Sequence, residues 1–278
     1  MWRSVPAGLA PVLEQVASVT RADRAVVRRT AVLVGLGNYT HPMTRHSLGQ
    51  YILPSLLLWA EAQDAALRAA IARRVSRLPS DADSYPLPVA PPTDPFRFVA
   101  PAQGWLARVS LLVDSAPPPG DAARRAPSFT LASYPYILLD VLLYVPRLLM
   151  NVNGRGVQAL LQTYPTLSPR HILLLHDELQ RAFGKVSFKA GGSAAGHNGV
   201  RSVQHVLRCR GASFQEPDVA RLRLGIGRPD DTRGGDVSAY VLGTMPDAWL
   251  ATCVATPPTF GPLVTATGQA FTRWSLSL

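Results

Sequence analysis

The chain has 278 residues and a mass of 30.0 kDa, and 47% of its residues are hydrophobic, which is enough for a packed core and excludes disorder throughout. Twenty-eight lysines and arginines against eighteen acidic residues give a formal net charge of +10, although only 17% of the residues are charged. This balance favours a polyanionic partner such as nucleic acid or an anionic membrane surface, with a general effect on solubility as the alternative.

Residues 1–30 form an amino-terminal extension that contains five arginines and two acidic residues. This composition is compatible with a mitochondrial targeting segment and equally with a ragged extension, so we expect a mitochondrial or cytoplasmic location. The two cysteines, Cys209 and Cys253, cannot build a disulfide framework or a four-ligand zinc site. The most apolar stretch, residues 134–150, is interrupted by Asp140, Pro146 and Arg147, so we expect no membrane span.

The first half of the chain predicts three strands, a long helix and a large insertion. Residues 31–37 are apolar and end in glycine, which is typical of a buried strand that leads into a loop. A helix is expected over residues 47–78, with a bend at Pro54. Residues 79–128 contain eleven prolines, so we expect mostly an inserted loop, within which residues 104–113 form a strand that pairs with residues 136–145.

The second half predicts an alternation of helices and strands. Helical spacing follows residue 152, and the apolar run before His176 predicts the next strand. Further strands are expected over residues 184–190 and 220–227, with a loop and a short helix between them. We therefore expect a single α/β domain over residues 31–245, with a mixed, mostly parallel central sheet flanked by helices and the Pro-rich insertion. Residues 246–278 are a tail without clear periodicity.

Polar side chains follow several of these predicted strands, where the functional loops of such a domain gather. His46 and Asp177 form a candidate general-base pair, because a neutral imidazole whose tautomer a carboxylate fixes accepts a proton at neutral pH. Asn38, Asn151 and Asn198 offer amide donors and acceptors that hold a peptide backbone or a developing oxyanion. The combination predicts hydrolysis of an acyl bond by water.

Other interpretations of the same residues remain open. His46 and Asp177 are also suited to capping a helix or a turn, as are His41, His171 and His205. A serine hydrolase is disfavoured because Ser193 lacks the G-x-S-x-G context. Residues 35–40 imitate a dinucleotide-binding loop, but Thr40 replaces its third glycine, so a nicotinamide oxidoreductase is a weak alternative. Histidine spacing predicts no metal site and the motifs no cofactor.

Eight short motifs occur in the order found in the bacterial-type peptidyl-tRNA hydrolases, which the chain resembles over residues 31–243. They are VGLGN (34–38), TRHSLG (44–49), MNVNGRGV (150–157), ILLLHDEL (172–179), GKVSFKAGG (184–192), GHNGVRS (196–202), RLRLGIGRP (221–229) and YVLG (240–243). The resemblance implies hydrolysis of the ester between a peptide and the 3′-terminal ribose of tRNA, by one monomeric chain without metal or cofactor.

The resemblance also implies a role for each matching residue. His46 would be the general base that activates water, and Asp177 would orient it. Asn38, Met150, Asn151 and Asn198 would bind the substrate around the ester. The phosphate of the tRNA acceptor stem would be held by Lys189 and Arg223.

A basic face downstream of Asp177 would serve the acceptor stem, with an ordinary solvated surface as its alternative. It comprises Lys185, Lys189, Arg201, Arg208, Arg210, Arg221, Arg223 and Arg228. Ser47 stands where the family has an asparagine, which leaves a second function open, that of an RNA-binding module with weakened hydrolysis.

Overall fold

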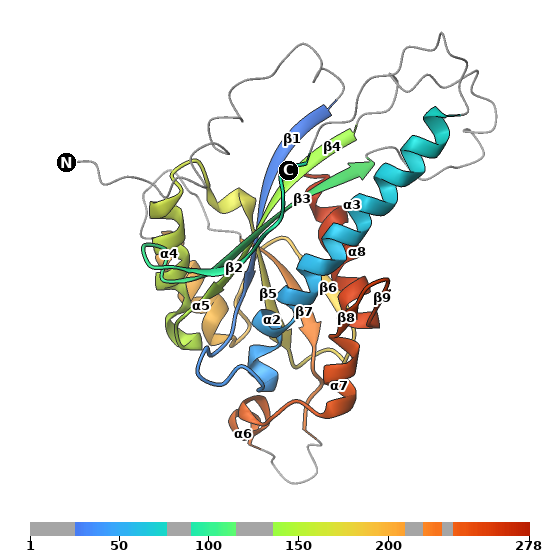
Figure 1. Ribbon diagram of the computed structural model, residues 1–278. Helices are drawn as coiled ribbons and strands as arrows, with labels where there is room; N and C mark the ends of the chain where they lie inside the picture. Colours follow the sequence, from blue (N-terminus) through green and yellow to red (C-terminus); the bar gives the residue numbers. More distant parts are fainter. Residues whose placement is uncertain (1–25, 77–89, 115–135, 209–218, 230–235) are drawn as a thin grey trace.

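The fold is built on one seven-stranded sheet, seen in the computed structural model that describes residues 26–76, 90–114, 136–208, 219–229 and 236–278 (Figure 1). The strand order is β2-β3-β4-β1-β5-β7-β6. The strands are β1 (Val26–Gly35), β2 (Asp94–Val99), β3 (Gly104–Asp114), β4 (Tyr136–Pro146), β5 (Ile172–Glu178), β6 (Val186–Lys189) and β7 (Ala220–Gly225). The four central strands β4, β1, β5 and β7 are parallel, and both edges are antiparallel, which confirms the mixed, mostly parallel sheet expected from the sequence.

Helices cover both faces of this sheet (Figure 1). One face packs against α2 (Leu48–Tyr51), α3 (Leu53–Val75) and α8 (Pro262–Ser275), and the other packs against α4 (Asn153–Thr163) and α5 (Asn198–Arg208). The remaining elements are short: α6 (Val237–Leu242), α7 (Asp247–Thr252), a β8–β9 hairpin (Ala255–Thr256, Thr259–Phe260), and the 3-10 turns η2 (Arg45–Ser47), η5 (Met150–Val152) and η6 (Pro169–His171). None of the helices in the described ranges is both long and apolar enough to span a bilayer.

The segment expected to be mostly loop contributes two strands to the sheet. β3 pairs with β4 along its whole length, as the sequence predicts, but β2 was not expected. Pro95 lies inside β2, where proline is tolerated because the outer side of an edge strand needs no hydrogen bonds. The other parts of the predicted insertion, residues 79–89 and 115–128, lie outside the described residues.

The packed part of the chain extends beyond the expected limits of the domain, residues 31 and 245. β1 begins at Val26, and the rest of the amino-terminal extension lies outside the described residues. The tail contains α8, whose Leu263, Phe271 and Trp274 belong to the same buried cluster as the strands. The packed unit therefore includes the carboxyl-terminal residues, which cover one face of the sheet.

Candidate active site

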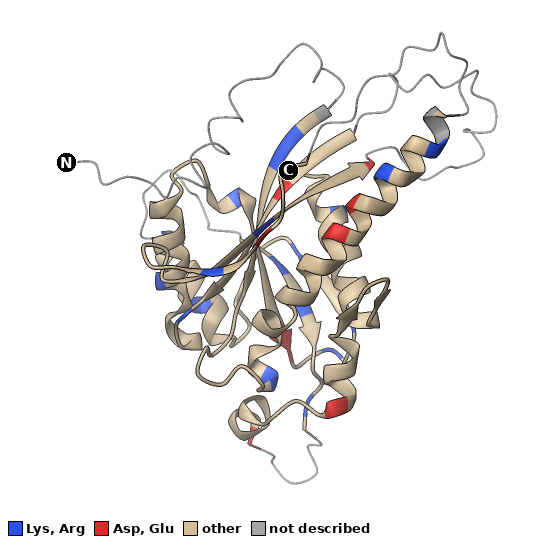
Figure 2. Ribbon diagram, viewed as in Figure 1, with Lys and Arg blue, Asp and Glu red and all other residues tan. Residues whose placement is uncertain are grey.

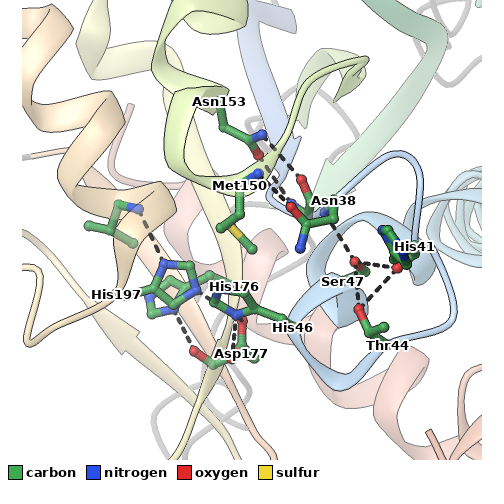
Figure 3. A network of polar contacts seen from close by, with 12 residues as sticks. Asn38, His41, Thr44, His46, Ser47, Met150, Asn153, His176, Asp177 and His197 are labelled. Atoms are coloured by element: carbon green, nitrogen blue, oxygen red, sulfur yellow. Dashed lines mark hydrogen bonds and ion pairs between the residues drawn. The ribbon is translucent and has the colours of Figure 1, made fainter. Parts of the chain in front are cut away.

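The polar residues predicted from the sequence gather where β1, β4 and β5 end (Figure 3). His46 lies on η2, which follows β1, and Asp177 lies near the end of β5, the neighbour of β1 in the sheet. Two glycines allow this approach: a Cβ at Gly49 would lie 2.1 Å from the Leu175 carbonyl oxygen, and one at Gly35 would lie 2.6 Å from the Gly49 carbonyl oxygen. The turn that carries His46 therefore rests directly on the ends of the two strands.

His46 and Asp177 form a close pair although 131 positions separate them in the sequence. His46 Nδ1 lies 2.9 Å from Asp177 Oδ1 and 3.0 Å from Oδ2. Because a carboxylate only accepts, the proton of the neutral imidazole sits on Nδ1 and leaves the Nε2 lone pair available to a substrate or a water. Burial disfavours the charged imidazole, but the hydrogen bond and the charge of Asp177 outweigh it and raise the His46 pKa above 6.5.

A second imidazole, from His197, also binds Asp177. His197 Nε2 lies 2.9 Å from Asp177 Oδ1, and its Nδ1 accepts the backbone N–H of Val200 at 3.2 Å. The Val200 contact fixes the neutral tautomer with the proton on Nε2, so His197 donates to Asp177. The rings of His46 and His197 lie 4.9 Å apart between centroids. Sequence reasoning placed His197 in this loop but gave it no role.

Asp177 is fully enclosed by these contacts, with a side chain that is only 3% exposed. Its burial favours the neutral acid, but its electrostatic interactions and hydrogen bonds with His197 and His46 outweigh that effect and hold the Asp177 pKa well below its ordinary value. The carboxylate therefore stays ionised at neutral pH. It is placed to stabilise an imidazolium on His46 when that ring takes up a proton.

His176 lies beneath the pair as a buried neutral ring. Its Nδ1 donates to the Asp177 carbonyl oxygen at 2.7 Å, and its ring meets that of His197 edge-on at 4.5 Å between centroids. Burial, followed by the electrostatic interaction with His197, lowers the His176 pKa well below 6.5. Within the described part of the chain its Nε2 has no hydrogen-bond partner. His176 thus packs against the ring of His197 and is not a second base.

Among the described residues, one set of side chains has the spacing of a metal site, and it consists of His46, Asp177 and His197. The ligand atoms of His46, Asp177 and His197 lie within 4.8 Å of one another. A neutral imidazole that binds a metal through one nitrogen carries its proton on the other nitrogen and donates it outward. His197 Nδ1 instead accepts an N–H from Val200, so its hydrogen bonds do not fit metal binding through Nε2.

Asn38 is held with its side chain oriented across the site. Its Oδ1 accepts the backbone N–H of Met150 at 2.7 Å, and its backbone N–H donates to Ser47 Oγ at 3.1 Å. Because Oδ1 is engaged as an acceptor, the amide NH2 group is the part of Asn38 that is left to donate. Ser47 also donates to the His41 carbonyl oxygen at 2.9 Å, so this serine stabilises the loop between Asn38 and His46.

Asn153, which the sequence did not single out, joins the two loops of the site. Its side chain is buried, accepts from Gly37 N at 3.1 Å, and donates to the carbonyl oxygens of Gly37 at 3.1 Å and Leu149 at 2.8 Å. Asn151, the predicted substrate-binding residue, is exposed on η5 nearby. Asn151 and Asn153 are only two positions apart, and the sequence does not indicate which of them supports the loops and which is free to bind a substrate.

Met150 and Asn198 lie on opposite sides of the contact between η5 and α5. Met150 is buried, and a Cβ at Gly199 would lie 2.3 Å from its sulfur, so the glycine makes room for it. Asn198 is exposed at the start of α5, and its Oδ1 accepts from Arg201 Nη2. Both residues therefore flank the His197 end of the site, but the side chain of Asn198 turns toward its own helix.

Comparison with known proteins finds a family that part of the chain matches. The family model described as peptidyl-tRNA hydrolase matches residues 128–256. A peptidyl-tRNA hydrolase from Solidesulfovibrio magneticus is 44% identical over 97 residues, which are 35% of this chain and 41% of that protein. One from Mycolicibacterium gilvum is 42% identical over 102 residues, which are 37% of this chain and 48% of that protein. Over residues 128–256 the chain is therefore similar to the peptidyl-tRNA hydrolase family.

A solved structure is similar in fold to most of this chain. The peptidyl-tRNA hydrolase of Acinetobacter baumannii superposes with a TM-score of 0.51 at 20% identity, covering 89% of each chain. In sequence, the chain matches less than half the length of the curated relatives named above. The family model begins after Asn38 and His46, so neither residue lies in the matched range. Both follow β1, which pairs with β5 inside that range.

The predicted phosphate-binding residues share one face of the β6–β7 pair. Lys189 pairs with Arg221 and Ser187 pairs with Arg223 in register, so Lys189 and Arg223 project from the same side. Arg223 Nη1 lies 3.5 Å from Glu178 Oε2, and Lys189 Nζ lies 3.4 Å from the Ser193 carbonyl oxygen. The two cations are thus neighbours beside the loop that carries His197.

The basic face is smaller than expected. Arg221 is only 2% exposed, and its Nη2 donates to the carbonyl oxygens of Gly191, Gly192 and Ser193 at 2.6 to 3.0 Å, so it holds the loop before His197. Lysines and arginines are spread over several elements in Figure 2 and do not form one block. Arg210 lies outside the described residues. Assigning Arg221 to an exposed face was wrong: it projects from the same face as Lys189 and Arg223, but the loop of residues 191–193 covers it.

Proposed function

We propose that the chain hydrolyses the ester bond between peptide and tRNA in peptidyl-tRNA and thereby releases free tRNA for reuse in translation. The observation that carries the proposal is the His46–Asp177 pair, with Nδ1 bound to a buried carboxylate and Nε2 left as the base. The names of the relatives support the substrate. Asn38, with its amide NH2 left to donate beside this pair, supports an acyl substrate.

The proposed reaction uses water as the nucleophile. His46 Nε2 takes a proton from a water molecule while the water oxygen attacks the ester carbonyl carbon, and Asp177 stabilises the imidazolium that forms. The amide NH2 group of Asn38 donates to the oxyanion, while Met150, Asn151 and Asn198 lie around the bound substrate. The intermediate then expels the 3′ oxygen of the ribose, which takes the proton from His46. The products are a peptide carboxylic acid and tRNA, and the substrate forms no covalent bond to the enzyme.

We also propose that Lys189 and Arg223 bind a phosphate of the acceptor stem, because they project from one face beside the His197 loop. A monomer is sufficient for the reaction, since every proposed catalytic group comes from one chain. The arginines of residues 1–30 support a mitochondrial location, and imaging of the tagged full-length chain would distinguish it from the cytoplasm.

The direct test is hydrolysis of an N-acetylaminoacyl-tRNA by the purified chain, with and without a chelator. We expect free tRNA to appear at the same rate in both reactions. The alternative is an RNA-binding module, which would shift tRNA in a gel and leave the ester intact. Cleavage that stops with the chelator and returns with added metal would instead show that His46, Asp177 and His197 hold a metal.

A further inference from the structure

An apolar groove lies next to the candidate active site and plays no part in the proposed chemistry. It has a volume of about 350 Å³ and is lined by Tyr39, Tyr51, Phe96, Trp105 and Val145, among others. Its walls come from the loop after β1, from α2, and from strands β2, β3 and β4. The groove therefore opens on the side of the sheet that α2 and α3 cover, beside the loop that contains Asn38.

Four planar side chains contact one another in a row beside this groove, and two of them, Tyr39 and Trp105, line it. The Arg147 guanidinium lies 5.4 Å from the ring centroid of Tyr39 and 5.2 Å from that of Phe98, and Phe98 meets Trp105 edge-on at 5.6 Å. We call these four residues the aromatic row. Tyr39, Phe98 and Trp105 are each 40% to 42% exposed, which is high for large apolar side chains.

The aromatic row is fixed to the same backbone that positions the site. Tyr39 follows Asn38, and its N–H donates to the Leu148 carbonyl oxygen at 3.3 Å, while Asn38 Oδ1 binds Met150 N. The backbone N–H of Arg147 donates to the Gln103 carbonyl oxygen at 3.0 Å, which ties the end of β4 to the β2–β3 turn. A ligand on the aromatic row would thus lie at a fixed distance from the site.

We propose that the aromatic row stacks an unpaired base near the 3′ end of the RNA substrate. Exposed rings interleaved with a guanidinium are the surface that single-stranded nucleic acids use, because every base has a π face and every nucleotide carries a phosphate that the cation attracts. An apolar peptide side chain would gain from the rings but not from the charge of Arg147. The inference rests on the proposed function, which places the 3′-terminal ribose of tRNA at His46.

The test compares the variants Phe98→Ala and Arg147→Ala with Arg97→Ala as the matched control. Arg97 is exposed, loses the same charge, and neighbours Phe98 on the other face of β2. Stacking contributes about 1–3 kcal/mol per base, so we expect a KM at least about 5-fold higher for both variants, an unchanged kcat, and little change for Arg97→Ala. An equal rise in KM for Arg97→Ala would mean that only net charge matters and would overturn the proposal.

Substrates with one missing base identify what the aromatic row binds. N-acetylaminoacyl-tRNAs that are abasic at one of the last four positions are assayed with the wild type and with Phe98→Ala. At one position, removal of the base should raise the wild-type KM by the same factor as the mutation and leave the variant unaffected. If the effect of Phe98→Ala is the same with every abasic substrate, or depends on the peptide side chain instead, the row does not bind a base.

A binding experiment separates this proposal from the proposed function. Binding of a short unpaired oligoribonucleotide is followed by tryptophan fluorescence in the wild type and in Trp105→Phe. We expect quenching that Trp105→Phe largely removes and that Phe98→Ala weakens, whether or not the chain cleaves the ester. Hydrolysis of peptidyl-tRNA without such quenching would overturn the aromatic row alone, whereas quenching without hydrolysis would overturn only the proposed reaction.

Discussion

Asp177 accepts hydrogen bonds from two imidazoles, and only one of them has a free nitrogen that can act as a base. His46 keeps its Nε2 lone pair, whereas the Nδ1 of His197 already accepts the N–H of Val200. This difference indicates that His46 transfers the proton and that His197 donates a hydrogen bond that holds Asp177 in place. The motif GHNG was visible in the sequence, but the partner of His197 became clear only from the fold.

The pH dependence of kcat/KM should report the pKa of His46. The hydrogen bond and charge of Asp177 outweigh burial and raise this pKa above 6.5, and only the neutral imidazole accepts a proton, so activity should fall as the pH drops through a value above 6.5. In Asp177→Asn the burial remains without the charge, so this midpoint should move below 6.5. A midpoint that does not move in the variant would contradict the assignment of His46.

His197→Phe tests the supporting role of the second imidazole. Phenylalanine keeps a ring against His46 and His176 but removes the N–H that donates to Asp177. A hydrogen bond to a charged group contributes about 1.5–3 kcal/mol, so we expect kcat to fall about 10- to 150-fold. His197→Gln retains an amide donor and should recover part of the loss. Equal loss in both variants would indicate a direct chemical role for the imidazole.

The two asparagines of η5 and α4 should differ in what their loss affects. Asn153→Ala leaves the backbone groups of Gly37 and the Leu149 carbonyl oxygen without their partner, so we expect a free energy of unfolding about 2–4 kcal/mol lower. Asn151→Ala removes an exposed side chain and should change KM with stability within about 0.5 kcal/mol of the wild type. Denaturant unfolding and kinetics of both variants check the contrast.

At the scale of the elements, the turn that carries His46 is anchored by the carboxyl-terminal part of the chain. Thr44 forms an isolated β-bridge with Thr244, and the N–H of Arg45 donates to the Gly243 carbonyl oxygen at 3.0 Å. The Arg45 guanidinium lies 4.5 Å from the ring centroid of Tyr240 and donates to its carbonyl oxygen. Residues 240–244 are therefore part of the support of the site.

The contact between α8 and α3 can be tested with a single methyl group. A Cβ at Gly268 would lie 2.6 Å from three ring atoms of Trp59, which is itself buried. We expect Gly268→Ala to lower the free energy of unfolding by about 1–3 kcal/mol, despite the better helix propensity of alanine. Gln269→Ala, at the neighbouring exposed position of α8, should stay within about 0.5 kcal/mol in the same denaturant titration.

The sequence predicts elements well where an apolar run is bounded by glycine or proline. β1, β4 and β5 were expected because their residues are apolar nearly throughout, as buried parallel strands are. β2 was missed because Pro95 and its polar neighbours obscure the alternation of Phe96 and Phe98. α8 was missed because threonines and glycines occupy buried positions, such as Thr267 and Gly268, whose polar groups are satisfied within the helix.

For the whole molecule, the order of the strands determines which residues meet. β1 lies between β4 and β5, so the loops that follow all three converge and bring Asn38, Met150 and Asp177 together. Apolar patterns predict strands but not their neighbours. The rule that functional loops gather at the carboxyl ends of such strands suggested this convergence, and the resemblance to a family agreed with it. Arg221 shows the same limit, because the sequence does not distinguish a buried arginine from an exposed one.

The net charge of +10 predicts binding to tRNA that depends on salt. Each phosphate contact adds about 0.7–0.9 to the slope of log Kd against log salt, so Lys189→Ala and Arg223→Ala should each reduce this slope by about that amount. Arg73→Ala removes an exposed cation on α3, outside the basic face, and serves as the control. A slope that is unchanged in both test variants would contradict phosphate binding at β6–β7.

The central claim is that His46 Nε2 is the base that activates water. Single-turnover hydrolysis of an N-acetylaminoacyl-tRNA by His46→Ala, with unfolding measured on the same sample, tests it most directly. A lost general base lowers the rate by about 10² to 10⁴, so we predict a fall of that size in a variant that still folds and binds tRNA. Release of tRNA by the folded variant at close to the wild-type rate would contradict the account.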